Sequence, residues 1–469
     1  MAPNLTCWSS HATLRDEPID TIFSYDALIW CILRSTVVFL LAVLGVVSVG
    51  MAHASLPDNV QIGILLPHTG SLHSSGVLMQ AAVDMAVADF NAYLEENDIR
   101  WRIMAVSEDT GTDPDTTLEK IKKLHDGGIN IIIGPGGSGQ LASIMNYTNE
   151  NNMLVISPGS TAPSLAISDD AIYRTVSDDL TQGRAFGAIM WHDDIRAIVP
   201  IWRGDVYGDD LVGAAVADFV ERGGVAYPGV RYDASSGAFD ESISELASVI
   251  DGVVAEHGAG HTAVLVVAFD EVVDLLRAAS GVDILRDVRW VSNEPAIQSG
   301  VQYDMALSEF VTDTRLVTIQ QFFSLTERGY SIQATLTERF GATPTVFVYP
   351  AYDAVWLAGL SVLEAGDTNP ANLRRVIHDV AASGINGTLD STVLNEAGDL
   401  EKSQVNFEAR ALIGDKWVPG YKYYGSIDTV VSECQVEVII KIQNGFSIIS
   451  DTLTYPCSDD DTGTYVYQK

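Results

Sequence analysis

The chain has 469 residues, with 62 Asp and Glu against 27 Lys and Arg, which gives a formal net charge of −35 at pH 7. This balance argues against nucleic acid and anionic lipid as partners, because both are bound by clustered cations. Hydrophobic residues make up 47% of the chain, so a substantial core can form and general disorder is excluded. The four cysteines are too few for a disulfide scaffold, and they lack zinc-site spacing. We therefore expect no metal and no other cofactor.

The N-terminal region carries an apolar run from Val37 to Ala52, preceded by Arg34 and followed by a small-residue step that ends at Ala54. This pattern predicts a secretory signal cleaved after Ala54. The alternative is a membrane anchor through residues 28–52, although the run is shorter than the roughly 20 residues that span a bilayer. Both interpretations place the rest of the chain outside the cytoplasm, in the periplasm or at the cell surface.

From Val60 onward, short apolar strands alternate with helices of regular apolar spacing. The first run of strands is predicted at 60–66, 101–106, 129–133 and 154–157, with helices at 77–94 and 115–125. The second run is predicted at 197–202, 225–232, 263–269 and 288–292, with helices at 208–222, 239–257 and 271–280, and a further helix at 349–365. Such alternation forms parallel sheets with right-handed crossovers. The pattern therefore predicts an α/β fold with two doubly wound parallel-sheet lobes.

Residues 134–139 match the G-x-G-x-x-G fingerprint of dinucleotide-binding folds. That fingerprint also requires an acidic residue after the next strand, to hold the ribose. The next strand ends in Ser157-Pro158-Gly159 without a carboxylate, and no Lys-Ser or Lys-Thr pair follows the glycines. No G-x-S-x-G elbow is present either. We therefore favour a protein that is not an enzyme over an oxidoreductase.

Two hydroxyl-bearing loops follow strands of the first run. Ser138 lies at the start of a predicted helix, and residues 157–163 form the second loop. In doubly wound sheets, ligands bind beyond the carboxyl ends of the strands, and hydroxyls with backbone N–H groups at helix starts suit a carboxylate. Ordinary helix capping explains Ser138 and Thr161 equally well. The spacing alone leaves both roles open.

The stretch from Ile132 to Pro135, together with residues 156–163, resembles the type I periplasmic solute-binding proteins, specifically the leucine/isoleucine/valine-binding branch of ABC import systems. Weaker similarity covers roughly residues 60–421. The resemblance implies lobes joined by a three-stranded hinge, with crossings near Val176, Gln320 and Gly387. The implied divisions are 1–54 as signal or anchor, 58–176 plus 320–387 as lobe 1, 177–319 plus 388–421 as lobe 2, and 422–469 as a C-terminal extension.

The resemblance also implies a binding site for a zwitterion. Ser138 and Thr161, with nearby backbone N–H groups, would hold the ligand α-carboxylate. The Gly159 carbonyl would accept a hydrogen bond from the α-ammonium, and Glu294 would be its counter-charge. Tyr207 would reach across from the second lobe on closure. The full implied set is Ser138, Gly159, Ser160, Thr161, Tyr207, Phe269 and Glu294.

Two departures from the family pattern leave the preferred ligand side chain open. Phe269 stands where amino-acid binders often carry Tyr, and Ser75 stands where an aromatic residue often precedes a glycine. His68 and Ser75, on the loop after the first strand, are further candidates for the ligand pocket; for His68 the alternative is a position facing water. Phe347 and Tyr349 are also candidates, with core packing as their alternative.

The C-terminal region has a different pattern. Residues 437–440 and 446–449 are predicted to form an antiparallel pair around Asn444-Gly445. Cys434 and Cys457 would be the cysteines left after signal cleavage, and in an oxidising compartment they could form a disulfide. Two free thiols are the alternative.

The implied function is an extracytoplasmic solute-binding protein of an ABC importer. It would bind a branched-chain-like amino acid, an amide or a similar small polar solute by hinge closure, and deliver it to the permease and ATPase subunits. The alternative is a sensory or orphan receptor ectodomain of the same fold. The lobes serve both uses, so the sequence does not separate them.

Overall fold

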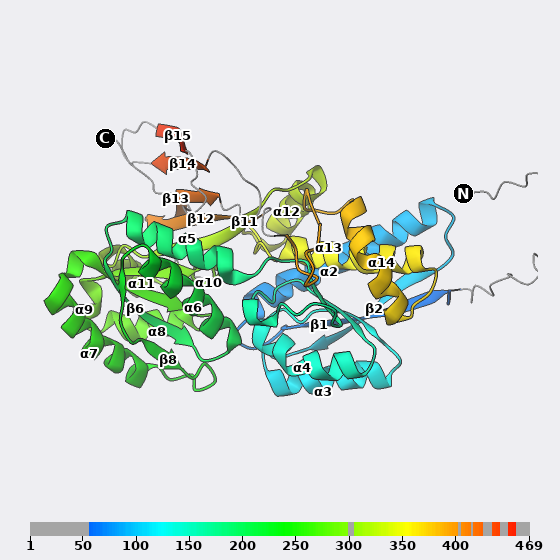
Figure 1. Cartoon of the computed structure of the whole chain (residues 1–469), viewed down its shortest axis with the longest axis horizontal. Coiled ribbons are helices and arrows are strands. Elements are labelled where there is room, and N and C mark those ends of the chain that lie inside the picture. The colour runs from blue at the N-terminus through cyan, green and yellow to red at the C-terminus, as the bar shows by residue number, and fades with distance from the viewer. Residues whose placement is uncertain are drawn as a thin grey trace, which may run out of the picture. The chain divides into compact units, whose positions relative to one another are not determined.

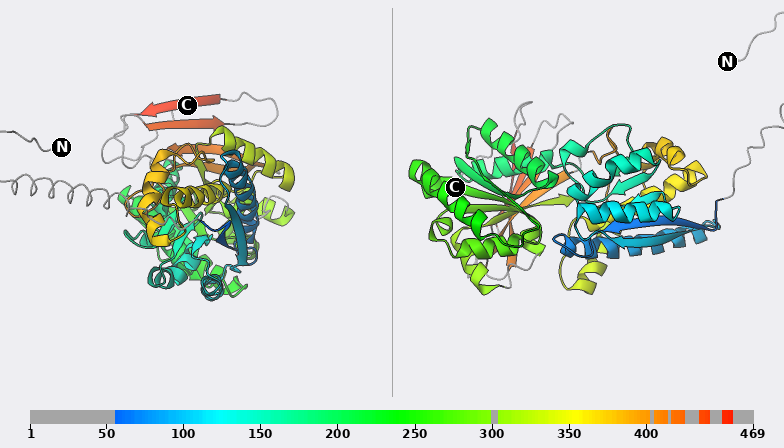
Figure 2. Two further views of the ribbon diagram at one scale, coloured as in Figure 1. Left: turned by 90° about the vertical axis from the view of Figure 1, so that its right-hand side faces the viewer. Right: turned by 90° about the horizontal axis from the view of Figure 1, so that it is seen from below.

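The computed structural model describes residues 56–298, 304–401, 405–413, 416–424, 434–440 and 449–455. The predicted signal or anchor at residues 1–54 and Cys457 of the predicted disulfide lie outside these ranges. The fold is α/β and contains two sheets, each with helices on both faces, as the alternating pattern predicts. Figure 2 shows the two sheets in adjacent bodies, the first coloured blue to cyan and the second mainly green. We call them the first and second lobes.

The first sheet has five parallel strands in the order β2-β1-β3-β4-β5 (Figure 1). Their bounds are β1 (Asn59–Leu66), β2 (Arg102–Asp109), β3 (Ile131–Ile133), β4 (Leu154–Ser157) and β5 (Ile172–Arg174). β3 and β4 are buried along their whole length, as expected for parallel strands covered on both faces. The helices of this lobe are α2 (His73–Glu96), α3 (Pro114–Asp126), α4 (Ser138–Glu150), η1 (Pro163–Leu165), α12 (Glu327–Phe340), α13 (Val348–Ala365) and α14 (Pro370–Ser383). α2 packs against α13 over one face, and α3 packs against α4 over the other.

The second sheet is mixed. Its parallel part is β6 (Ala197–Arg203), β7 (Val225–Ala226), β8 (Val230–Tyr232), β9 (Thr262–Val267), β10 (Arg289–Asn293) and β11 (Val317–Phe323). Its antiparallel part is β12 (Val405–Ile413), β13 (Lys416–Tyr424), β14 (Cys434–Ile440) and β15 (Ile449–Tyr455). The helices are α5 (Asp179–His192), α6 (Val206–Glu221), α7 (Asp240–His257), η2 (Ala259–His261), α8 (Val272–Ser280), α9 (Asp283–Arg286), α10 (Pro295–Gln298) and α11 (Met305–Asp313). α5 and α6 pack together over one face, and α7, α8 and α11 contribute to the separate core on the other face.

Several predicted element bounds differ from those in the structure. The single strand at 225–232 is divided into β7 and β8, which pair with β6 on either side of Val199 and Pro200. The helix predicted from Val77 already begins at His73, so Ser75 belongs to its first turn. In the C-terminal pair, the described part of the second strand is Ile449–Tyr455, and residues 446–448 of the predicted strand lie outside the described residues. That strand pairs antiparallel with β14, as expected for the pair itself.

The third crossing between the lobes also differs from its expected position. Residues 388–421 are expected in the second lobe, but Thr388 and Leu389 donate their backbone N–H groups to Asp353 of α13, over 2.6 and 3.1 Å. Further on, Asp399 forms a parallel bridge with Arg174 at the edge of the first sheet. The segment up to residue 400 therefore extends the first lobe, and the crossing lies between Glu401 and β12 rather than near Gly387.

Candidate functional site

A small cavity lies between the two lobes, beyond the carboxyl ends of their parallel strands. Its lining residues are Leu72, Ser75, Met79, Gly136, Ser138, Gly159, Thr161 and Phe347 from the first lobe, and Tyr207, Phe269, Glu294 and Pro295 from the second. The cavity volume is about 20 Å³, which is room for little more than one water molecule. The lobes are therefore closed on each other in this structure.

Most residues singled out from the sequence lie in the cavity wall. They are Ser75, Ser138, Gly159, Thr161, Tyr207, Phe269, Glu294 and Phe347. Three others do not. Ser160 is fully buried behind its loop, His68 directs Nε2 at Gln80 Oε1 over 3.0 Å, and Tyr349 is buried in the core of the first lobe. Burial raises the pKa of the Tyr349 hydroxyl to about 12, as expected for a side chain in the core.

Ser138 joins the two hydroxyl-bearing loops. Its Oγ accepts hydrogen bonds from the backbone N–H groups of Thr161 and Ala162, each over 3.1 Å. A hydroxyl has two acceptor sites and one proton, so Ser138 has its proton left to donate to a ligand. Ser138 also begins α4, which has no side-chain cap and no acidic residue in its first turn. The helix dipole therefore adds positive potential at the same point.

The loop around Gly159 approaches the preceding loop closely. A Cβ at Gly159 would lie 2.5 Å from the carbonyl oxygen of Gly136, so only glycine fits. The carbonyls of Ser160, Thr161 and Ala162 all accept hydrogen bonds from protein donors. Within the described part of the chain, no donor is directed at the Gly159 carbonyl. That oxygen is therefore the acceptor this loop can offer to a ligand.

Two buried carboxyl groups lie near the cavity: Glu294 in its second-lobe wall, and Asp179 behind the wall, next to Thr161. Glu294 follows β10, is 5% exposed, and accepts a 3.0 Å hydrogen bond from Gln182 Nε2. Asp179 accepts a 2.8 Å hydrogen bond from Thr161 Oγ1. Burial raises the pKa of both groups, and the Glu294 charge raises that of Asp179 further. In the described ranges, neither forms an ion pair with a side-chain cation. A ligand cation would therefore stabilise the ionised forms.

An aromatic pair forms part of the second lobe's wall. The rings of Tyr207 and Phe269 stack with centroids 5.0 Å apart and an interplanar angle of 25°. Asn293 Nδ2 donates to the Tyr207 hydroxyl over 2.8 Å, which fixes that ring. The Arg203 guanidinium lies 3.7 Å from the Phe269 centroid, and its Nη1 donates to Glu271 over 2.6 Å. The aromatic wall is therefore held rigidly from behind.

Hydrogen bonds join the lobes next to the cavity. Asp270 of the second lobe accepts from the Ser74 backbone N–H over 3.0 Å and from Ser74 Oγ over 2.6 Å. The Asp270 N–H donates to the Ser71 carbonyl over 2.9 Å. α2 begins here, and its N-cap residue, Leu72, provides no side-chain cap. Asp270 therefore caps a helix of the opposite lobe.

Sequence reasoning missed Asp179 and Asp270. Asp270 directly follows Phe269 at the end of a predicted strand, so its position was a usable signal. Asp179 belongs to an Asp-Asp pair after β5, and nothing in the sequence indicates its hydrogen bond to a threonine 18 residues earlier.

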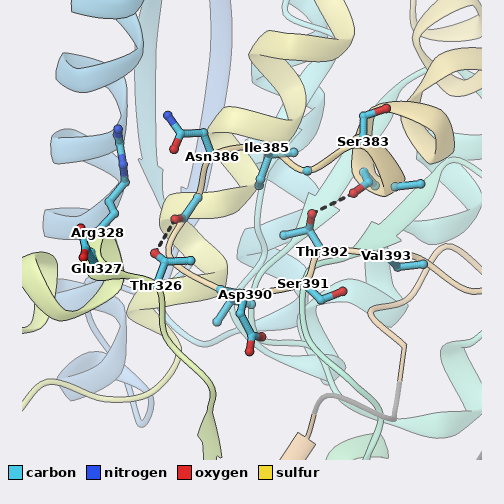
Figure 3. A pocket seen from close by; sticks show the side chains of 15 residues that line it. Thr326, Glu327, Arg328, Ser383, Ile385, Asn386, Asp390, Ser391, Thr392 and Val393 are labelled. Carbon is cyan, nitrogen blue, oxygen red and sulfur yellow. Dashed lines mark hydrogen bonds between the residues drawn. The ribbon is translucent and has the colours of Figure 1, made fainter. Parts of the chain in front are cut away.

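A larger hollow of about 660 Å³ lies elsewhere on the first lobe, between the start of α12 and residues 381–393. Figure 3 shows that two of its hydroxyl groups are bonded within its own wall: Thr326 Oγ1 donates to the Gly387 carbonyl over 2.8 Å, and Thr392 Oγ1 to the Ala381 carbonyl over 2.9 Å. We assign no ligand to it. Across the described ranges, no three His, Cys, Asp or Glu side chains are grouped so as to hold a metal ion, and no helix is long and apolar enough to cross a membrane.

Two doubly wound lobes closed over a cavity with a donor-rich and an acidic side define a two-lobed solute-binding protein. The chain belongs to the periplasmic binding protein family, whose model, described as "Periplasmic binding protein", matches residues 59–398. It is thus a solute-binding protein and not an enzyme.

Several relatives are similar in sequence. An uncharacterized protein of Methanocaldococcus jannaschii is 26% identical over 311 residues, which cover 65% of this chain and 73% of that protein. The leucine-, isoleucine-, valine-, threonine- and alanine-binding protein of Pseudomonas aeruginosa is 23% identical over 368 residues, covering 77% and 91%. The chemotactic signal transduction system substrate-binding protein BasB of Halobacterium salinarum is 30% identical over 168 residues, covering 34% and 40%.

Solved structures share the fold. A leucine binding protein, LivK, of Thermotoga maritima superposes with a TM-score of 0.62 at 16% identity, covering 77% of this chain and 98% of that one. A solute-binding protein of an ABC transporter from R. palustris, in complex with benzoate, gives a TM-score of 0.62 at 18% identity, covering 77% and 95%. At such identities the likeness establishes the fold alone.

Proposed function

We propose that this protein captures an α-amino acid, or a small solute of the same dipolar character, outside the cytoplasm and delivers it to the permease and ATPase subunits of an ABC importer. One observation carries the proposal: the cavity has two chemically opposite sides. The Ser138 hydroxyl and the start of α4 supply donors on one side, and Glu294 is an acidic group without an ion-pair partner among the described residues on the other. A zwitterion matches both sides.

The two ends of such a ligand have distinct partners. Its carboxylate accepts from Ser138 and from the N-terminus of α4, and its ammonium donates to the Gly159 carbonyl and to Glu294. Hydrogen bonds to charged groups are worth roughly 1.5–3 kcal/mol each. An aromatic acid such as benzoate carries no ammonium group, so it would leave the buried Glu294 unpaired. The acidic side therefore favours an amino acid over an aromatic acid.

The side-chain pocket is apolar. Leu72, Met79 and Phe347 provide aliphatic and aromatic surface from the first lobe, and Phe269 provides it from the second. This lining favours a branched-chain-like ligand side chain, because apolar side chains gain free energy by leaving water. The cavity is lined by both lobes, so a ligand can enter it only when they separate. Binding therefore requires the lobes to separate, admit the ligand and close again, which couples occupancy to hinge closure.

Calorimetry on protein freed of bound solute tests the proposal. We expect leucine, isoleucine, valine and alanine to include at least one tight ligand, and benzoate to bind at least about tenfold more weakly than that ligand. Mass spectrometry of material extracted from the freshly purified protein identifies the natural solute independently. Tight binding of benzoate with no response to any amino acid would overturn the assignment of the acidic side.

A sensory role for the same binding event is the second candidate. The similarity to the chemotaxis protein BasB over 168 residues supports it. Deleting the gene separates the roles: an importer component predicts loss of radiolabelled amino acid uptake, whereas a sensor predicts intact uptake and loss of the behavioural response.

A further inference from the structure

We infer that Arg174 is a positioning residue for the ligand carboxylate. It orients the loop of residues 159–162 through a buried ion pair with Asp399, and it does not line the cavity itself. The inference rests on the proposed function for the nature of the ligand, but its structural part stands on contacts within the protein.

The Arg174 guanidinium donates hydrogen bonds to the Asp399 carboxylate and to two backbone carbonyls. Nε and Nη2 donate to the two carboxylate oxygens of Asp399 over 2.5 and 2.6 Å, and Nη1 donates to the carbonyls of Ser160 and Ala162 over 3.2 and 2.8 Å. Arg174 is completely buried, and Asp399 is 2% exposed. A planar guanidinium can make this bidentate pair and reach two carbonyls at the same time, whereas a lysine ammonium cannot.

These bonds fix the peptide groups that face the ligand. The Ser160 carbonyl and the Thr161 N–H belong to one planar trans peptide group, so they point in opposite directions. Arg174 holds the carbonyl end, and Ser138 Oγ accepts from the N–H end. The next peptide group is held in the same way, because Asp179 N–H donates to the Thr161 carbonyl and Ser138 Oγ accepts from the Ala162 N–H. Arg174 therefore sets where the Ser138 hydroxyl lies and where its proton is directed.

The ion pair also joins this loop to the hinge. Arg174 ends β5, directly before the first crossing, and Asp399 lies directly before the third. Their backbones are paired as well: the Arg174 N–H donates to the Gly398 carbonyl, and the Leu400 N–H donates to the Arg174 carbonyl, each over 2.9 Å. One buried side chain thus fixes the carboxylate-binding loop relative to two of the three segments that connect the lobes.

The test compares Arg174→Lys with the wild type by calorimetry with leucine and by hydrogen exchange. Arg222→Lys is the matched control, because Arg222 forms a largely buried ion pair with Asp218 on α6, away from the cavity. We expect Arg174→Lys to weaken leucine binding about tenfold or more, the equivalent of one lost hydrogen bond to a charged group. The Thr161 and Ala162 amides should exchange faster, those of β3 should not, and the control should match the wild type.

Two outcomes overturn the inference. One is unchanged leucine affinity together with unchanged exchange at Thr161 and Ala162. The other is faster exchange throughout the first lobe, which would make Arg174 a residue of general stability. If Arg174→Lys does not fold, Asp399→Asn provides a second comparison, because both oxygens of the Asp399 carboxylate accept hydrogen bonds from Arg174. If the wild type binds neither leucine nor another amino acid, the proposed function fails, and the exchange pattern alone decides the positioning role.

Discussion

Asp270 of the second lobe caps helix α2 of the first lobe, and this contact leads to a prediction about lobe closure. In Asp270→Ala, the backbone N–H and the hydroxyl of Ser74 lose their acceptor. α2 has no cap of its own to replace it, and removing an N-cap acid costs about 0.5–2 kcal/mol. Burial raises the pKa of the Asp270 carboxyl, so desolvation offsets part of what its hydrogen bonds contribute. We expect the closed form to lose about 1–2 kcal/mol relative to the open form.

This loss translates into affinity. If the ligand is bound in the closed form and the ligand-free protein is mainly open, destabilising the closed form by about 1–2 kcal/mol weakens binding about 5- to 30-fold. The melting temperature without ligand should change little, because the lost contacts join the lobes and do not hold either core together. Calorimetry measures the affinity, and small-angle scattering at a fixed, sub-saturating ligand concentration reports the smaller closed fraction of the variant.

Two variants control for unrelated effects of the substitution. Ser74→Ala removes the hydroxyl donor but keeps the backbone hydrogen bond to Asp270, so its effect should be smaller and in the same direction. Asp251→Ala removes an exposed acid from α7 and should leave the affinity unchanged. If Asp270→Ala bound the ligand and scattered like the wild type, the reasoning that this cap stabilises closure would be refuted.

Three further predictions follow from the charges. Glu294→Gln should weaken amino acid binding roughly 10- to 100-fold, while the exposed control Glu245→Gln binds like the wild type in calorimetry. Because the pKa values of Asp179 and Glu294 are raised without ligand and a bound ammonium lowers them, binding should release protons. Affinity should therefore rise with pH through these raised values, and titrations in buffers of different ionisation enthalpy would contradict this if they detected proton uptake. A net charge of −35 makes the folded chain repel itself. Raising NaCl from about 0.1 to 1 M shortens the screening length from about 10 to 3 Å, so the melting temperature should rise. A lower melting temperature at high salt would argue against this reasoning.

The fold could be predicted because its signals are local. Apolar runs such as residues 131–133 alternate with helices, and this pattern alone indicates two parallel sheets. β5, β11, β12 and β13 went unpredicted. β5 has only three residues, too few to show a period. β12 adds antiparallel to β11, and the local sequence does not indicate that pairing. The third crossing was misplaced because Asp399 pairs with Arg174 across 225 residues of sequence, a contact without a local signal.

The site could be predicted only in part, for a similar reason. Ser138 and Glu294 stand at strand ends, where ligands of doubly wound sheets bind, and the resemblance to a family gave them roles. Asp179, Arg174 and Asp270 act through contacts distant in sequence, with Thr161, the Ser160 carbonyl and Ser74 respectively. Such contacts depend on how distant parts of the chain pack together, within one lobe or between the two, and local sequence patterns do not encode this.

Under the proposed function, the division of charge between the lobes makes closure and recognition a single event. The donors for a carboxylate belong to the first lobe, and Glu294 belongs to the second. A ligand resting on the open first lobe therefore has only one of its charges satisfied, and its ammonium gains a counter-charge when the second lobe arrives. A solute that carries only one of the two charges would leave the Ser138 side or the Glu294 side unpaired in the closed cavity, where an unpaired buried polar group is costly. Selection for a dipolar ligand thus takes place in the closing step, and the inter-lobe cap from Asp270 sets how much ligand binding energy closure requires.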